Sequence, residues 1–259
     1  MKPIEILEKF KNQIPGFLGA AVGFGEEDPA LLHGDTVFPA ASIIKIPILI
    51  YLLSEKEKNH LDLKEIVPLK NSDKVGGSGI LLELHEGTPL TLLDLATLMI
   101  VVSDNTATNL LMDRLETKKI QAMIGSLGLS HTVLGRKMMV APDAPPANFT
   151  TPLETFLLFK KLLIGELLSQ ENTQLAIDIL FRQQYNEKIP ALLPKDVKVG
   201  HKTGEITGIR HDCGIIRSQD QDLILCLFTK DISDEWRTDR VLAELSRALY
   251  EHYMKGMNP

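Results

Sequence analysis

Hydrophobic and polar positions follow two different periods along the chain, and its first quarter contains both. Residues 1–10 mix apolar residues with Glu and Lys at the spacing of an amphipathic helix. Phe17–Phe24 is a run of glycine, alanine and larger apolar residues typical of a strand, and 30–38 predicts a second, weaker strand. A helical pattern then covers 42–58, with Pro47 near its first turn, where a missing N–H costs least.

The middle of the chain is predicted to be mostly helical, and the end returns to the period of strands. Residues 142–148 contain three prolines and therefore predict a loop. Helices are expected at 91–101, 106–115, from Thr151 onward and at 173–184. Strands are expected at 197–202, 209–217 and 222–230, followed by a helix that Ser233 or Asp234 caps and that ends near Lys255.

This order of elements predicts one antiparallel sheet of about five strands, built from both ends of the chain. The expected fold class is α/β of the α+β type, with helices flanking the sheet and an all-helical domain inserted between its strands. Residues 1–58 and 195–259 would form the sheet domain, and 59–194 the inserted helical domain.

The two cysteines are predicted to face each other. If the last two strands form a hairpin whose turn is centred between Gln219 and Asp220, Cys213 and Cys226 become cross-strand neighbours. Two packed thiols are the expected state, because free cysteine usually behaves as a small buried apolar residue. A cross-strand disulfide is the alternative.

Composition narrows the class of partner. The net charge is −6 and aromatic residues make up 5% of the chain, without a cluster of basic residues. Nucleic acid is therefore not expected as a partner, and a small molecule or peptide is. No apolar run approaches the roughly 20 residues of a membrane span. The charged N-terminus does not resemble a signal peptide, so the protein would be cytoplasmic if the chain is complete, or exported if a signal has been removed. The oligomeric state stays open.

Three short motifs carry the candidate chemistry. Ser42 and Lys45 are three residues apart in a helical segment, so the amine can reach the hydroxyl and take its proton. Ser103, Asp104 and Asn105 lie at a break between two helices. Each motif also has a structural interpretation, because serine, aspartate and asparagine cap helices and a lysine one turn later is often solvated.

The third motif, Lys202, Thr203 and Gly204, ends a predicted strand, where glycine would let a substrate approach the backbone. A solvated lysine at a strand end is its structural interpretation. The three motifs together are the signature of class A β-lactamases and penicillin-binding proteins. The segments around them, 38–45, 103–111 and 201–204, and the layout of the whole chain resemble the class A-type β-lactamase family.

The resemblance implies a role for each matching residue. Ser42 would attack an amide carbonyl, and Lys45 would take or relay its proton. Ser103 would pass a proton to the leaving nitrogen, with Lys202 tuning the local field. Substrate binding is implied for Asn105, Thr203, Gly204 and Glu205: Asn105 would hold the acyl side chain, Thr203 with Lys202 the carboxylate, and the N–H groups of Ser42 and Glu205 the oxyanion. No cofactor and no metal are implied.

The sequence departs from the family in two places. Class A enzymes carry a glutamate, followed closely by an asparagine, in a loop before the next helix, and this glutamate activates the deacylating water. Residues 136–152 contain no glutamate; Asp143 is their one acid, and Glu154 already belongs to the next helix. Deacylation is therefore expected to be slow. The second departure is Glu205, whose carboxylate would repel an anionic substrate, pair with Arg210 or Lys202, or turn to solvent.

Two other patterns in the sequence are typical of different functional sites. Residues 76–79 form a glycine-rich loop that is expected to line the cleft, and they lack the lysine of a phosphate-binding loop. His211 and Asp212 raise the alternative of a Ser–His–Asp triad, but adjacent strand residues point to opposite faces. The remaining histidines show no metal-binding spacing.

The sequence thus predicts a serine hydrolase that is acylated at Ser42 by β-lactams or related amides and esters. A D,D-peptidase or small-ester hydrolase is the alternative enzyme, because such relatives need no loop glutamate. A sensor that stays acylated by a β-lactam or cell-wall fragment is the alternative binding protein.

Overall fold

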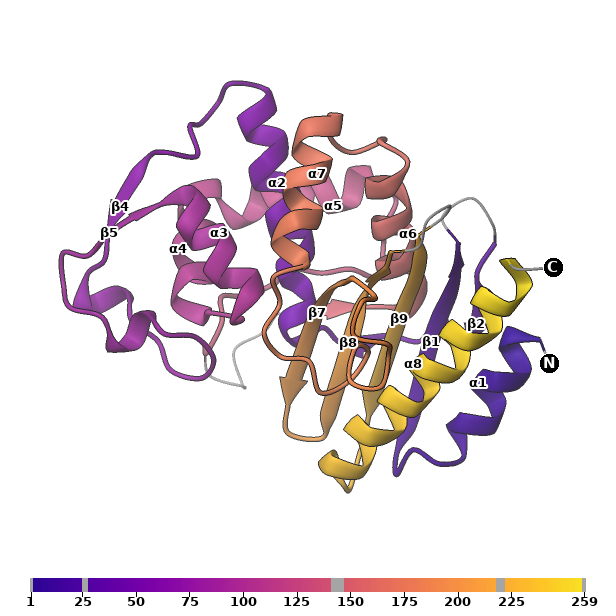
Figure 1. Cartoon of the computed structure of the whole chain (residues 1–259). Coiled ribbons are helices and arrows are strands. Elements are labelled where there is room, and N and C mark those ends of the chain that lie inside the picture. Colours follow the sequence, from indigo (N-terminus) through magenta and orange to yellow (C-terminus); the bar gives the residue numbers. More distant parts are fainter. Residues whose placement is uncertain (1, 25–27, 141–146, 218–221, 258–259) are drawn as a thin grey trace.

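The structure, a computed structural model, describes residues 2–24, 28–140, 147–217 and 222–257, and of 255–257 the backbone alone. Its centre is a five-stranded antiparallel sheet in the order β2-β1-β9-β8-β7. The strands are β1 (Phe17–Phe24), β2 (Ala30–Leu32), β7 (Val199–Ile206), β8 (Ile209–Ile216) and β9 (Leu223–Lys230). The predicted sheet, built from both ends of the chain, is therefore confirmed (Figure 1).

Helices cover both faces of this sheet, because its strands alternate between two apolar cores. In β9, Leu223, Leu225 and Leu227 face one core, while Ile224, Cys226 and Phe228 face the other. The first core is closed by α1 (Pro3–Lys11) and α8 (Glu235–Met257), which lie side by side on one face (Figure 1). On the other face α6 (Pro152–Leu163) packs against β1 and β9.

The remaining helices gather around α2 (Lys45–Glu57), whose residues from Lys45 to Leu53 are all buried. A helix that is apolar nearly all round needs partners on every side, and α3, α4, α5 and α7 supply them. Their bounds are Leu92–Val101, Asn105–Leu115, Thr117–Ser126 and Gln170–Leu180. Two small ladders complete the fold, β3 (Phe38–Pro39) with β6 (Phe149–Thr150) and β4 (Ile66–Pro68) with β5 (Pro89–Thr91). The proposed division into a sheet domain and a helical domain stays a prediction.

Four predicted elements are corrected by the structure. Residues 30–38 are not one strand, because the backbone leaves the extended region at His33 (φ 48°), and Phe38 then pairs with β6 instead of β1. The helix expected over 42–58 begins with a 3₁₀ turn at Ala41–Ile44, and the α-helix starts only at Lys45. The helix predicted at 173–184 is α7, which starts and ends earlier. The strand predicted at 197–202 extends to Ile206, so Lys202, Thr203 and Gly204 lie inside β7 and not at its end.

The predicted hairpin register is confirmed, since Cys213 lies directly opposite Cys226. Both cysteines are buried free thiols. The loop expected at 142–148 and the hairpin turn at 218–221 lie mostly or wholly outside the described residues. Among the helices that are described, none combines the length and the apolar character needed to cross a membrane.

Candidate active site

Ser42 lies half-buried in the 3₁₀ turn that joins β3 to α2, and this turn packs against β7. The close approach depends on Gly204. A Cβ at this position would come 3.0 Å from Ile43 Cγ1 and 3.4 Å from the Ala40 carbonyl oxygen. Gly204 therefore brings the predicted Lys202–Gly204 motif beside the predicted nucleophile. Ala41, just before Ser42, has a φ of 44°, a strained conformation of the kind found at functional sites.

Lys45 is the first residue of α2 and is fully buried. Its Nζ donates hydrogen bonds to the Ser103 carbonyl oxygen at 2.7 Å, to Ser103 Oγ at 3.1 Å and to Asn105 Oδ1 at 2.9 Å. Burial and the neighbouring charge of Lys202 hold the pKa of Lys45 well below its usual value. The Lys45 amine therefore joins the first and second motifs. Among the hydrogen bonds of the described residues, none links this amine to Ser42.

Lys202 is the second lysine that binds the Ser103 hydroxyl. Its Nζ donates to Ser103 Oγ at 3.0 Å and to the Thr203 carbonyl oxygen at 2.8 Å. Burial lowers the pKa of Lys202 to about 7. One serine hydroxyl thus lies between two buried amines that both lose their protons more easily than a solvated lysine does. Ser103 itself has a φ of 54°, which strains the backbone at the centre of this contact.

The glycine-rich loop 76–79 closes against the second motif. Asp104 caps α4 by accepting a hydrogen bond from Ala107 N at 2.8 Å, and its other oxygen accepts from the N–H groups of Ile80 and Leu81. A Cβ on Gly79 (φ 114°) would lie 2.2 Å from Asp104 Oδ2. Asn105 adds a hydrogen bond from its Nδ2 to the Gly76 carbonyl oxygen. Asp104 therefore holds the loop in place, a function that its capping propensity alone did not reveal.

Glu205 does not pair with Arg210 or Lys202. Its carboxylate binds the Nζ of Lys188, a fully buried lysine that the sequence analysis missed. Burial works to raise the pKa of Glu205, but the charge and hydrogen bond of Lys188 outweigh it and the pKa falls. Arg210 binds Glu235 instead. The pairing of Glu205 with Lys188 could not be predicted, because Lys188 belongs to no motif and only the path of the loop that carries it brings it to β7.

The alternative triad is excluded by the contacts of its two members. Asp212 accepts a hydrogen bond from His201 Nδ1 at 2.7 Å and another from Ile189 N at 2.9 Å. His211 points to the opposite face of β8, where its Nε2 donates to the Pro39 carbonyl oxygen and its Nδ1 accepts from Thr229 N. Burial lowers the pKa of His211 to about 4, so this ring is neutral and structural.

Asp143 and Glu154 are the two acids in or just after the predicted loop. Asp143 lies outside the described residues. Glu154 is buried in the first turn of α6, where it accepts hydrogen bonds from Thr132 Oγ1 at 2.6 Å and His131 N at 2.8 Å. Asn148 Oδ1 accepts from the N–H groups of Gly135 and Arg136 and so fixes the described ends of the loop. Within the described ranges, no three His, Cys, Asp or Glu side chains come together as a metal site.

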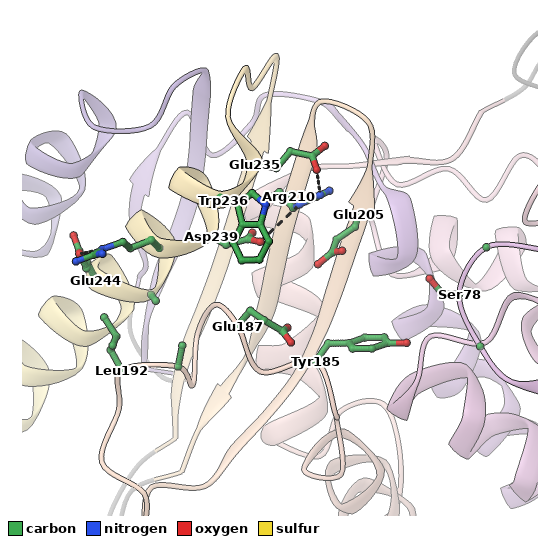
Figure 2. A pocket seen from close by; sticks show the side chains of 15 residues that line it. Ser78, Tyr185, Glu187, Leu192, Glu205, Arg210, Glu235, Trp236, Asp239 and Glu244 are labelled. Carbon is green, nitrogen blue, oxygen red and sulfur yellow. Dashed lines mark hydrogen bonds and ion pairs between the residues drawn. The ribbon is translucent and has the colours of Figure 1, made fainter.

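A cavity of about 220 Å³ opens beside Ser42 and is lined by Ser78, Asn105, Asn148 and Glu205. A larger groove of about 970 Å³ adjoins it, since Gly77, Ser78 and Glu205 line both (Figure 2). Residues from three distant parts of the sequence therefore meet around Ser103, and a small molecule can reach Ser42 through the cavity.

The chain is similar to known proteins over nearly its whole length. A model of the β-lactamase enzyme family matches residues 5–253. The β-lactamase Toho-1 of Escherichia coli is 30% identical, over 76% of this chain and 70% of its own length. The β-lactamase OXY-2 of Klebsiella oxytoca is 28% identical, over 95% of this chain and 87% of its own.

Solved structures agree with this result. A β-lactamase from Sphaerobacter thermophilus DSM 20745 has a TM-score of 0.90 and 32% identity, and the match covers 96% of each chain. The structure of PBP-A has a TM-score of 0.88 and 28% identity over 97% of this chain and 96% of its own. The family match and these structures cover almost every element described above, so this protein belongs to the β-lactamase enzyme family and is a hydrolase of the class A β-lactamase type.

Proposed function

We propose that Ser42 is acylated by β-lactams, with Lys45 and Ser103 moving the protons and Lys202 tuning the local field. The observation that carries this proposal is the position of Ser103 Oγ, which lies 3.1 Å from Lys45 Nζ and 3.0 Å from Lys202 Nζ, two residues before Asn105, which lines the cavity beside Ser42. A serine hydroxyl becomes a strong nucleophile only when a neighbouring base takes its proton. Burial and the charge of Lys202 lower the pKa of Lys45, which favours the neutral amine that can act as this base.

The proton then has a short path to the leaving group. Ser42 Oγ forms a bond to the carbonyl carbon, and its proton passes to the neutral amine of Lys45. Ser103 Oγ, hydrogen-bonded to that amine, gives its own proton to the departing nitrogen and takes one from Lys45 in return. The C–N bond of the lactam breaks, and Ser42 carries an ester.

Substrate binding uses the groups around this path. β7 is an edge strand, so alternate N–H groups of this strand point away from β8. We assign the oxyanion to the N–H groups of Ser42 and Glu205, a type of contact worth about 3–4 kcal/mol per donor in hydrolases. Lys202 and Thr203 would hold the carboxylate of the substrate and Asn105 its acyl side chain, while the space beside Gly204 is filled by Ile43 and Ala40 of the turn.

Deacylation is proposed to be slow, because no unpaired carboxyl group lines the Ser42 cavity within the described part of the chain. Of the described residues that line the Ser42 cavity, Glu205 alone carries a carboxyl group, and Lys188 binds it. Glu154 is held by Thr132 and His131 on the inner side of α6.

Intact-protein mass spectrometry tests the acylation. A penicillin is expected to add its own mass to the protein, and Ser42→Ala should abolish this adduct, because the nucleophile is lost. Ser126→Ala, an exposed serine at the end of α5, is the matched control and should keep the adduct. A wild-type protein without an adduct at high concentration and long incubation would refute the proposal.

The second half of the reaction is measured by following the same adduct over time after excess penicillin is removed. We expect the adduct to persist for minutes or longer. Loss within seconds, or fast turnover of a chromogenic cephalosporin, would contradict slow deacylation and leave the acylation step intact.

A peptidase or esterase acting on acyclic substrates is the second candidate. The specific observation in its favour is the same missing carboxylate, together with the likeness to PBP-A, one solved form of which is an acyl-enzyme complex with penicillin G. Peptide thioesters distinguish the two functions. Faster acylation and turnover with a thioester than with a penicillin would favour the second candidate.

A further inference from the structure

The groove beside the Ser42 cavity is much larger than the cavity itself. It lies between the first turns of α8, the β7–β8 hairpin, the segment 185–192 and the loop 77–79, and has a volume of about 970 Å³. Figure 2 shows Trp236 and Asp239 of α8 gathered around the same space as Glu187 and Glu205. Ser78 and Glu205 line both spaces, so the groove adjoins the place where a substrate would bind at Ser42.

Carboxylates outnumber positive charges on the described lining of this groove. The two arginines are already paired, Arg210 with Glu235 and Arg240 with Glu244. Lys188, buried beneath the lining, binds Glu205. Five carboxylates therefore face two arginines and one buried lysine; they belong to Glu187, Glu205, Glu235, Asp239 and Glu244.

Two of these carboxylates have capacity for a further donor. Glu187 is exposed and forms no ion pair with any described residue. Asp239 Oδ1 is buried without a hydrogen-bond partner; its carboxylate forms two long ion pairs, with Lys188 Nζ 3.7 Å from Oδ1 and Arg210 Nε 3.8 Å from Oδ2. A buried oxygen without a donor costs free energy until a donor arrives. A ligand with several N–H donors would satisfy it.

The electrostatic environment of the groove is negative on both sides. Burial raises the pKa of Asp239; the charges of Lys188 and Arg210 act against this rise, and the carboxylates of Glu205 and Glu187 add to it. Across the groove, burial raises the pKa of Tyr185, and the same two carboxylates raise it further. A positive charge placed between these side chains would therefore be stabilised.

An exposed aromatic ring completes the lining. Trp236 is 89% exposed and lies in the first turn of α8, next to Glu235. Such exposure is costly for an indole, and its π face attracts cations. Carboxylates combined with an open tryptophan face are the groups that recognise an ammonium ion.

We propose that this groove binds a protonated amine carried by the substrate that acylates Ser42, held by Glu187, Asp239 and the face of Trp236. The inference rests on the proposed function, because it assigns a charged substituent to that substrate. It predicts that amide or ester substrates with an alkylammonium group are preferred over otherwise identical neutral ones.

Binding can be measured without any acylation, because Trp236 is the one tryptophan of the chain. In the Ser42→Ala variant, tryptophan fluorescence is titrated with a short lysine-containing peptide amide and with the same peptide acetylated on the lysine amine. A saturable change with the first peptide, and binding at least about tenfold weaker for the second, is expected. Equal responses to both peptides would overturn the proposal.

The lining is then tested by matched substitutions. Glu187→Gln should reduce the preference for the free amine severalfold, since an exposed, unpaired carboxylate is removed without disturbing the fold. Asp35→Asn, an exposed residue next to β2 at the opposite edge of the sheet, is the control and should keep the preference. A preference that Glu187→Gln leaves unchanged would contradict the assignment.

Catalysis gives the second readout. Two thioesters that differ only in an alkylammonium or an acetamide group on the leaving side are compared by the second-order rate of Ser42 acylation. We expect the ammonium ester to react about tenfold faster at low salt and to lose this advantage at high salt; equal rates would refute the preference. If neither these esters nor a penicillin labels Ser42, the proposed function fails, and the fluorescence titration alone decides whether the groove binds an amine.

Discussion

At the scale of single residues, the site combines three buried lysines in two electrostatic states. Burial dominates for Lys45 and Lys202 and lowers the pKa of both. Burial also acts on Lys188, but Asp212 and Glu205 outweigh it and raise the pKa of that lysine above its usual value. The difference comes from the partners, since Lys188 Nζ binds a carboxylate whereas the other two amines bind neutral oxygens. Lys188 therefore carries a stable charge, and the other two can exchange protons.

This difference predicts the pH dependence of acylation. The pKa of Lys202 is lowered to about 7, so its amine is charged below this pH and neutral above it. A substrate carboxylate needs the charged form. The second-order acylation rate of a penicillin should therefore fall as the pH rises through about 7, while a neutral ester should show no such fall. Stopped-flow or mass-spectrometric rates between about pH 5.5 and about 9 test this prediction, because this range brackets the lowered pKa of Lys202.

A penicillin rate that stays constant or rises through this range would show that Lys202 does not hold the carboxylate as a cation. Parallel profiles for the penicillin and the neutral ester would contradict the same assignment, because the fall would then belong to the chemistry and not to substrate charge.

At the scale of elements, the site depends on contacts between short irregular segments and regular ones. The 3₁₀ turn that carries Ser42 lies against β7 because Gly204 has no side chain, and the loop 76–79 lies against α4 because Gly79 has none. In each case the missing side chain of a glycine lets a loop or turn approach a regular element closely. Substitutions that add side-chain volume at these contacts should therefore lower the free energy of unfolding and slow the acylation of Ser42.

Gly79→Ala tests the contact with α4. Its Cβ would lie 2.2 Å from Asp104 Oδ2, and the backbone there has a φ of 114°, which side chains other than hydrogen disfavour. We expect the free energy of unfolding to fall by roughly 1–3 kcal/mol and acylation of Ser42 to slow, because Asp104 and its neighbours Ser103 and Asn105 must move.

The matched control is Gly125→Ala in α5, where a Cβ meets nothing within 4 Å. Alanine favours a helix over glycine by up to about 1 kcal/mol, so this variant should be as stable as the wild type or more stable, with unchanged acylation. Chemical denaturation of both variants gives the comparison, and equal effects of the two substitutions would disprove the steric explanation.

At the scale of the whole molecule, one apolar core joins the helices around α2 to a face of the central sheet. Ile100 of α3, Leu111 of α4, Phe156 of α6 and Phe228 of β9 belong to this one cluster. Ser42, Ser103 and Lys202 lie at its edge, on elements that share it. The geometry between the motifs therefore depends on packing that no single segment can maintain alone.

Leu49→Ala in the middle of α2 tests this dependence. Leu49 is buried in the shared cluster, and a leucine-to-alanine change in a core costs about 2–5 kcal/mol. We expect the backbone amides of α4 and of β8 to lose the same free energy of protection in native-state hydrogen exchange, because both elements rest on one core. Loss of protection in α4 with β8 unchanged would indicate two separately folding parts.

The sequence by itself determined the strand pattern, the five-stranded antiparallel sheet, the facing cysteines and the three motifs, because these depend on local period and on residues close together in the chain. Only the tertiary structure decided which side chains meet across long separations. The pairing of Glu205 with Lys188, the contact of His201 with Asp212 and the hold of Asp104 on the Gly79 loop all join segments whose distance is set by chain path. A buried charge must find a partner or change its pKa, and which of these happened at Lys188, Lys45 and Lys202 was settled by the neighbours that folding supplied.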